Sequence, residues 1–402
     1  MRALASFTGS LDDAEEYAAE AVARAAAHER DGGRPIESYA AWCTSVAKRA
    51  WLDDARRRTT WRRLAPELAR PEADRAAMDA DDLSRHGHEG LDDRLALLFV
   101  ACDEAISPAS RMVLALRVVC GLTIPEIAGH LGVQDTAAAA RLTRAKRALA
   151  EARGAFHVPD ATERNRRLPV VIACVAGMFT VAHRTVLDPA DALADTGRQA
   201  LSIADALVAA HPDDTEVRGL RAVIRLGLAR RPGRVDDTGT GLALDEVDRT
   251  RWDGALLRAG LDDATLAASG EGRFAIEAAI AGLHSSAASF ERTDWGHIVA
   301  LYGALEHRWP SPSVRVARLV ATAQGLLAAD PEASLGAVEA ELAFLVRGAP
   351  AYASRDASLA LADLEWRTGR RERAAERYRD LAEVMPAEPL RRFCLRRAVT
   401  PQ

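Results

Sequence analysis

The chain has 402 residues, enough for two or three domains that each bury a hydrophobic core. Aromatic residues make up only 5% and alanine is abundant, while runs of alternating β-branched residues are not evident, so we expect an all-α fold. The net charge of -5 does not favour a nucleic-acid binder overall, and five widely separated cysteines without a CxxC pair argue against a disulfide framework or a zinc site and fit a reduced cytosol.

Residues 1–65 are expected to form two helices, of which the first is acidic. Ser10 can cap this helix, and five acidic residues lie between Asp12 and Glu20. The acidic face is either solvated or docks a basic protein partner. A catalytic carboxylate pair is not expected there, because no histidine or apolar cluster surrounds these residues to shift a pKa.

The second helix, "SYAAWCTSVAKRAWLDDARRRTTWRRL", combines three tryptophans with seven cations between Lys48 and Arg63. Cations bind a nucleic-acid backbone and aromatic faces stack on unpaired bases, so the segment is predicted to contact nucleic acid. The alternative is a basic amphipathic helix whose tryptophans, Trp42 above all, pack in the core. Residues 66–90, rich in proline and charged residues, are predicted to be a flexible linker.

Residues 91–155 are expected to form a compact domain of four helices, ending in "GLTIPEIAGHLGVQDTAAAARLTRAKRAL". Thr123 and Glu126 have the spacing of a capping box, and Gly132 lies where a left-handed turn is needed. Asp135 is expected to cap the last helix. This spacing predicts a helix-turn-helix that binds DNA, the alternative being a purely structural helical hairpin.

The last helix of this domain is basic at its end and apolar on one face. Its buried face is expected to comprise Ala138, Leu142, Ala145 and Leu149. The four consecutive alanines 137–140 offer little for reading bases beyond a methyl contact. The residues expected to contact DNA are Gln134, Thr136 and Arg141 at base edges, and Arg141, Arg144, Lys146 and Arg147 at phosphates.

Residues 156–402 are expected to be a run of helices broken by segments rich in proline and glycine, with the pattern of a tetratricopeptide hairpin at residues 357–388 but no strict period. The apolar window 168–182 is too short to cross a bilayer and is predicted to be a buried helix, so no membrane contact is expected. Trp252 and Trp295 each neighbour aspartates, which indicates buried polar pairs or, alternatively, a ligand pocket between helices.

The sequence carries no evident catalytic signature. We find no GxSxG, HExxH, Walker A or dinucleotide-binding glycine pattern in a suitable context. The ten histidines are scattered and lack ligand spacing. We therefore expect a protein that is not an enzyme, with no cofactor and no metal.

The order of acidic helix, basic aromatic helix, linker and helix-turn-helix resembles the RNA polymerase sigma factors of the extracytoplasmic function group, sigma-24-like. It is similar in particular to a subgroup with a long, tetratricopeptide-like C-terminal extension. The segments that carry the resemblance are "DDAEEYAAEAV", "PIESYAAWCTSVAKRAWLDDARRR", "LDDRLALLFVACDEAISPASRMVLALRVVCGLTIPEIAGHLGV", "RLTRAKRAL", "RLPVVIACVAGMF", "LDEVDRTRWDGAL", "AAIAGLHS", "TDWGHIVALYGALE" and "PSPSV".

This resemblance implies a region 2-like domain at 1–65, a linker at 66–90, a region 4-like helix-turn-helix domain at 91–155 and a helical extension at 156–402. It implies that Glu16 and Glu20 bind the RNA polymerase core, and that the helix from Asp135 enters the upstream promoter element. The residues implied to contact the melted downstream promoter element are Trp42, Lys48, Arg49, Trp51, Arg56, Arg57 and Arg58.

The implied function is that of a cytoplasmic alternative sigma factor that directs polymerase to promoter DNA. Its extension is expected to modulate activity, including by contact with the sigma domains. Several polar residues usual in the group are absent here: Lys48, Arg49 and Ala50 stand in place of Arg-Asn-Arg. The group usually has another helical stretch before Arg2, so we expect either that the start is misassigned or that part of the polymerase-binding surface is absent. The alternative hypothesis is a divergent, sigma-like interaction protein that no longer initiates transcription.

Overall fold

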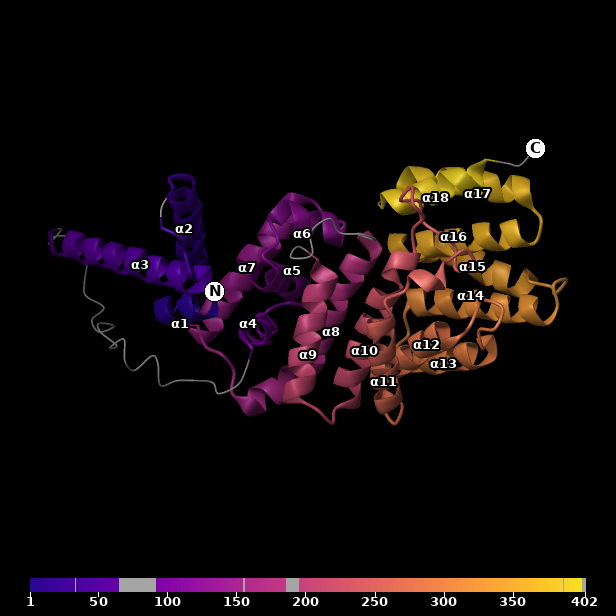
Figure 1. Cartoon of the computed structure of the whole chain (residues 1–402), viewed down its shortest axis with the longest axis horizontal. Helices are drawn as coiled ribbons and strands as arrows, with labels where there is room; N and C mark the ends of the chain where they lie inside the picture. The colour runs from indigo at the N-terminus through magenta and orange to yellow at the C-terminus, as the bar shows by residue number, and fades with distance from the viewer. Residues whose placement is uncertain (33, 65–91, 155, 186–194, 386, 400–402) are drawn as a thin grey trace. The chain divides into compact units, whose positions relative to one another are not determined.

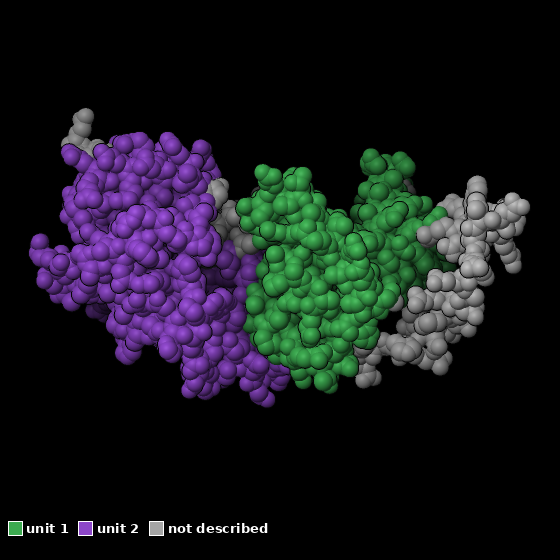
Figure 2. Space-filling view, turned by 180° about the vertical axis from the view of Figure 1, so that it is seen from behind, with its two compact units in different colours: residues 1–174 green, residues 175–402 purple. Residues whose placement is uncertain are grey.

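The computed structural model describes residues 1–32, 34–64, 92–154, 156–185, 195–385 and 387–399, without the side chains of 56–64, 130 and 181–185. These residues form eighteen α-helices and two short 3-10 helices, with no strand beyond an isolated antiparallel bridge between Val235 and Gly241. The expectation of an all-α fold is confirmed. The chain divides into two compact units, residues 1–174 and 175–402, coloured separately in Figure 2.

The first three helices of unit 1 are α1 (Arg2–Thr8), α2 (Leu11–Arg30) and α3 (Tyr39–Leu64), and they pack on one another. The sequence reasoning did not foresee α1, which ends at Gly9 in a left-handed conformation (φ 72°). The side chain of Ser10 accepts a hydrogen bond from the backbone N–H of Asp13, so the expected cap of the acidic helix is confirmed.

The rest of unit 1 contains α4 (Asp93–Ala101), α5 (Pro108–Cys120), α6 (Ile124–Leu131), α7 (Asp135–Arg153) and the first part of α8 (Ala161–Thr185). Every residue from Leu95 to Ala101 is buried, so α4 forms the centre of this core. The predicted linker 66–90 lies outside the described residues. The predicted boundary at residue 155 precedes α8, whereas the division into compact units falls within that helix.

Helix α8 buries most of its apolar side chains between Leu168 and Phe179, as the sequence predicted for this window. Within the described residues no helix is long and apolar enough to cross a membrane.

Unit 2 continues with helices that pack on their neighbours in chain order (Figure 1). Glycine permits the close crossing of α10 and α12: a Cβ atom built on Gly219 would lie 2.5 Å from the backbone carbonyl carbon of Phe274. The helices are α9 (Thr196–Ala210), α10 (Thr215–Arg230), α11 (Gly254–Ala267), α12 (Arg273–Ser286), α13 (Trp295–Arg308), α14 (Pro312–Ala329), α15 (Gly336–Gly348), α16 (Ala351–Arg367), α17 (Arg371–Val384) and α18 (Glu388–Ala398).

The segment between α10 and α11, residues 231–253, which we call the α10–α11 connection, joins elements far apart in the sequence. The N–H of Gly241 donates to the carbonyl of Pro389 (2.9 Å), and Arg392 donates to the carbonyl of Thr238 (2.8 Å). Glu246 pairs with Arg396 and Arg397 of α18. The connection therefore links the start of unit 2 to its last helix.

The aspartates beside Trp252 and Trp295 do not form buried polar pairs, so that expectation is wrong. Asp248, Asp253 and Asp294 are exposed, and each accepts hydrogen bonds from backbone N–H groups at the start of a following helix. They satisfy N–H groups that have no partner within the helix, which is the usual role of aspartate at such positions.

Candidate nucleic-acid interface

Helices α6 and α7 form the expected helix-turn-helix. Thr123 accepts from the N–H of Glu126, whose carboxylate accepts from the N–H of Thr123 (2.7 Å), so both halves of the capping box are present. Gly132 ends α6 in the left-handed conformation, with φ 63°. Because the two ends of the turn are fixed by local hydrogen bonds and by glycine, the direction of α7 relative to α6 follows from the sequence.

The expected cap of α7 is wrong by one residue. Gln134 is the N-cap and its side chain makes no capping hydrogen bond, while Asp135 is the first residue of the helix. An acidic residue in the first turn still interacts favourably with the positive end of the helix dipole. The side chain of Gln134 is exposed and carries no capping role.

One face of α7 is buried and the opposite face is open. Ala138 and Ala145 are fully buried, Leu149 is 8% exposed and Leu142 is half-buried, close to the expected pattern. Arg147 is exposed and pairs with Glu151 on the next turn of the same helix (2.6 Å). The exposed or half-exposed residues on the other side are Thr136, Ala137, Ala140, Arg141 and Arg144.

Lys146 is held by the acidic helix α2. Its Nζ atom lies 2.5 Å from Asp12 and 2.9 Å from Glu15, and its side chain is only 17% exposed. Glu15 also pairs with Arg117 of α5. In this arrangement a DNA phosphate would have to displace two carboxylates to reach Lys146.

The pKa values of Glu15 and Lys146 shift in the directions expected when each charged group stabilises the other. Burial alone would raise the pKa of Glu15, but its bonds to Lys146 and Arg117 outweigh burial and lower it. Burial alone would lower the pKa of Lys146, but Asp12 and Glu15 raise it. Glu15 and Lys146 therefore stay charged at neutral pH, and the ion pair between them persists there.

The residues expected to bind the melted downstream element lie along α3. Trp51 donates from Nε1 to Asp13 (3.1 Å) and packs edge-on against Phe7 with ring centroids 5.2 Å apart. The ammonium of Lys48 lies 5.1 Å from the centroid of the same Phe7 ring. Arg49 is exposed; the side chains of Arg56, Arg57 and Arg58 lie outside the described residues.

Helix α1 therefore supplies a packing partner that the sequence reasoning lacked. Of the two tryptophans of α3 whose side chains the structure describes, Trp51 makes a hydrogen bond as well as a ring contact within the domain. Trp42 is half-buried, with its ring centroid 5.9 Å from that of His28.

The two acidic residues expected to dock polymerase lie on the outer side of α2. Glu16 is exposed, and Glu20 forms an exposed pair with Arg24 (2.6 Å) on the next turn. Their neighbours Asp12 and Glu15 face the helix-turn-helix domain. The acidic helix thus presents carboxylates on two sides, one engaged within unit 1 and one open to a partner.

Residues 98–149 match a family described as sigma-70, region 4. Residues 167–268 match a family of unknown function (DUF6596). An uncharacterized protein of Rhizobium meliloti (strain 1021) is 35% identical over 342 residues, covering 84% of this chain and 79% of the relative. The chain belongs to the same family as this relative and carries a sigma-70 region 4 domain. No solved structure matches the chain.

A buried ion cluster at the edge of the region 4 domain escaped the sequence reasoning. Asp103, 2% exposed, accepts from Arg153 of α7 (2.9 Å) and pairs with Arg167 of α8 (2.8 Å). Burial would raise the pKa of Asp103, but the N–H of Ala105 and the two arginines lower it. The sequence did carry a signal for this cluster: Asp103 directly follows the apolar run of α4, and a carboxylate buried there requires a cationic partner.

Proposed function

We propose that the chain is an alternative sigma factor of the extracytoplasmic function group, which acts in the cytoplasm, is not an enzyme and directs RNA polymerase core to specific promoters. The observation that carries the proposal is the region 4 domain, whose open α7 face bears Arg141 and Arg144 beside Gln134 and Thr136. The acidic and basic helices α2 and α3 precede it in the order that sigma factors use. The chain would supply binding and base capture, while polymerase performs the chemistry.

The region 4 domain is suited to phosphate contacts more than to direct base reading. Arginines neutralise phosphates whatever the sequence, whereas Ala137 and Ala140 offer only methyl groups to the major groove. Promoter choice would then depend on Gln134, Thr136 and Arg141, on DNA shape and on α3.

The test is a pull-down of RNA polymerase core with the full chain, followed by run-off transcription from the promoters that the loaded polymerase occupies. Core binding together with promoter-dependent transcripts supports the proposal. Failure to bind core contradicts it. Core binding without transcripts from any promoter would leave the alternative, a sigma-like interaction protein that does not initiate transcription.

We further propose that unit 2, a tetratricopeptide-like extension of stacked helical hairpins, modulates this activity, including through contact with the sigma domains. The support is its size: the extension is larger than the sigma part and forms a compact unit of its own. A chain ending at Thr185, checked by circular dichroism, should give a different yield of run-off transcript per bound polymerase from the full chain. Equal yields would contradict modulation.

A further inference from the structure

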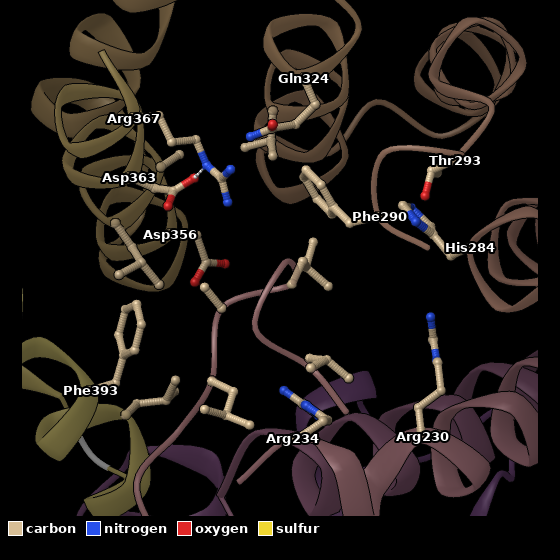
Figure 3. Close-up of a pocket in the computed structure, with 18 of the residues that line it drawn as sticks. Arg230, Arg234, His284, Phe290, Thr293, Gln324, Asp356, Asp363, Arg367 and Phe393 are labelled. Carbon is tan, nitrogen blue, oxygen red and sulfur yellow. Dashed lines mark hydrogen bonds and ion pairs between the residues drawn. The ribbon is translucent and has the colours of Figure 1, made fainter. Parts of the chain in front are cut away.

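Unit 2 contains a cavity of about 470 Å³, within the range of small-molecule sites. It lies among the end of α10, the α10–α11 connection, α12, α14, α16 and α18, so segments distant in the sequence form its wall (Figure 3). Its lining is mostly apolar, with a few polar groups. The apolar residues that matter most for a ligand are Leu242, Trp252, Phe290, Val320, Leu359 and Phe393.

The charged lining is predominantly cationic. Four arginines and two aspartates line the cavity: Arg230, Arg234, Arg249, Arg367, Asp356 and Asp363. On one wall, Asp363 and Arg367 neutralise each other through an ion pair of 2.7 Å (Figure 3).

On the opposite wall, neither Arg230 nor Arg249 forms an ion pair with any carboxylate of the described residues. Arg230 donates from Nε to the carbonyl of Leu226 (3.1 Å), within its own helix. Arg249 donates to the carbonyls of His284 and Ala287 and lies over the Trp252 ring, 4.9 Å from its centroid. Two guanidinium groups are thus held at the cavity without a carboxylate in ion-pair contact, although Glu291 lies near enough to Arg249 to favour its charge.

Burial makes this excess of positive charge costly. Burial lowers the pKa of Arg230. Burial also lowers the pKa of Arg234, to about 10, with a further contribution from the positive charges of Arg230 and Arg231. Burial and the nearby Arg230 and Arg249 lower the pKa of His284 to about 4, so the imidazole is neutral at pH 7. The arginines remain charged at that pH, and a bound anion would relieve their repulsion.

A neutral polar group at the cavity also lacks a partner. Gln324 of α14 is 5% exposed and lines the cavity, yet its amide makes no hydrogen bond within the described part of the chain. Buried amides are nearly always hydrogen-bonded, so an unpaired one facing a cavity indicates a missing ligand or water. Its two N–H donors suit an oxygen-rich group.

We propose that this cavity binds a small organic anion with an apolar body, whose anionic group lies against Arg230 and Arg249 while a polar atom of its body hydrogen-bonds to Gln324 across the cavity (Figure 3). Guanidinium groups match carboxylate, phosphate or sulfonate oxygens, and the aromatic and aliphatic wall accommodates the body. The α10–α11 connection closes the site, so ligand binding couples the first hairpin of unit 2 to its last helix.

The probe is 8-anilinonaphthalene-1-sulfonate, an aromatic anion, titrated into the full chain by fluorescence and calorimetry. We expect one saturable site. Arg230→Met keeps the apolar stem and removes the charge, so it should weaken sulfonate binding by roughly tenfold. The uncharged analogue N-phenyl-1-naphthylamine should bind Arg230→Met and the native chain alike.

Arg258→Met is the matched control, because it removes the same charge from an exposed position of α11 outside the cavity. It should leave sulfonate binding unchanged. Gln324→Met removes the unpaired amide and keeps a side chain of similar shape. It should weaken binding of the sulfonate probe by roughly threefold. This variant tests the proposal if circular dichroism shows that Arg230→Met is unfolded.

Competition defines the ligand class. Decanoate should displace the sulfonate, and inorganic phosphate at the same concentration should not, because it lacks an apolar body. The proposal is overturned if no saturable site exists, if Arg230→Met and Arg258→Met bind the sulfonate equally, if Gln324→Met binds it like the native chain, or if phosphate displaces it as well as decanoate does.

Discussion

The ammonium of Lys146 on α7 lies 2.5 Å from a carboxylate oxygen of Asp12 on α2. A residue suited to bind DNA is thereby paired with a residue of the helix expected to face polymerase. Glu15 completes the arrangement by pairing with both Lys146 and Arg117. Within unit 1, the DNA binding proposed for α7 and the position of α2 are therefore linked through charge.

Releasing Lys146 should strengthen DNA binding. The double change Asp12→Asn and Glu15→Gln should raise the affinity for duplex DNA by roughly fivefold and steepen its salt dependence by about one unit of slope, because one more phosphate is neutralised. Fluorescence anisotropy over a range of salt concentrations measures both quantities. The matched control Glu16→Gln with Glu20→Gln removes the same charge from the outer side of α2. An equal gain in both doubles would mean that net charge, not Lys146, is responsible.

Loss of Arg144 should weaken DNA binding whatever the sequence. Arg144→Ala removes an exposed cation from the open face of α7, and a lost phosphate contact should cost roughly fivefold in affinity near physiological salt. Anisotropy with several unrelated duplexes tests this, with Arg258→Ala as the charge-matched control. A loss confined to one duplex would show instead that Arg144 reads a base.

The buried carboxylate of Asp103 should matter to the stability of unit 1. Asp103→Asn removes the shorter ion pair of Arg167, which is 3% exposed, and leaves Glu163 at 3.6 Å as its remaining carboxylate, so it should lower the free energy of unfolding by about 2 kcal/mol. Urea denaturation gives the value, and hydrogen exchange of α4 and α7 amides assigns it to unit 1. Glu151→Gln breaks an exposed pair with the same charge change and should cost far less, because solvent screens that pair. Similar losses in both variants would refute the structural role of Asp103.

The same carboxylate predicts a pH dependence. The folded-state pKa of Asp103 lies below its ordinary value, so its contribution is fully present above the unfolded pKa of about 4 and is lost as pH falls through the folded pKa. The stability difference between the native chain and Asp103→Asn should be constant from pH 7 to pH 5 and shrink below about pH 4. Thermal denaturation at each pH measures it. A difference that instead shrinks as pH rises would contradict the assigned direction.

The crossing of α10 and α12 should not tolerate a methyl group. Gly219→Ala places Cβ 2.5 Å from the backbone of Phe274 and should destabilise unit 2 by about 1–3 kcal/mol. Gly303→Ala, in helix α13 with no atom within 4 Å of the added Cβ, should stabilise it by about 0.5–1 kcal/mol through better helix propensity. Urea denaturation measures both changes in the free energy of unfolding. Because close packing predicts a loss for Gly219→Ala and a gain for Gly303→Ala, changes of the same sign would contradict it.

Features set by neighbouring residues were accessible from the sequence. The Thr123 and Glu126 box, the left-handed Gly132 and the cap at Ser10 each depend on residues at most three positions apart, and all were predicted. Helix ends were less accurate: the N-cap of α7 is Gln134 and not the expected Asp135, which is the first residue of the helix.

Features that join distant residues could not be predicted. Lys146 and Asp12 are 134 positions apart, and nothing in either segment indicates the other. Trp51 looked like a base-stacking residue because α1, which supplies Phe7, was not foreseen. The cavity of unit 2 likewise unites Arg230 with Gln324 and Phe393, which only the tertiary fold brings together.

The α10–α11 connection gives unit 2 an unfolding behaviour unlike that of an open array of repeats. In an open array each hairpin contacts only its neighbours, so end hairpins fray and can be deleted at local cost. Here the contacts of Gly241 with Pro389 and of Glu246 with Arg397 close the array between its first and last layers. Loss of α18 would release the start of the unit as well, so unit 2 should melt as one cooperative block.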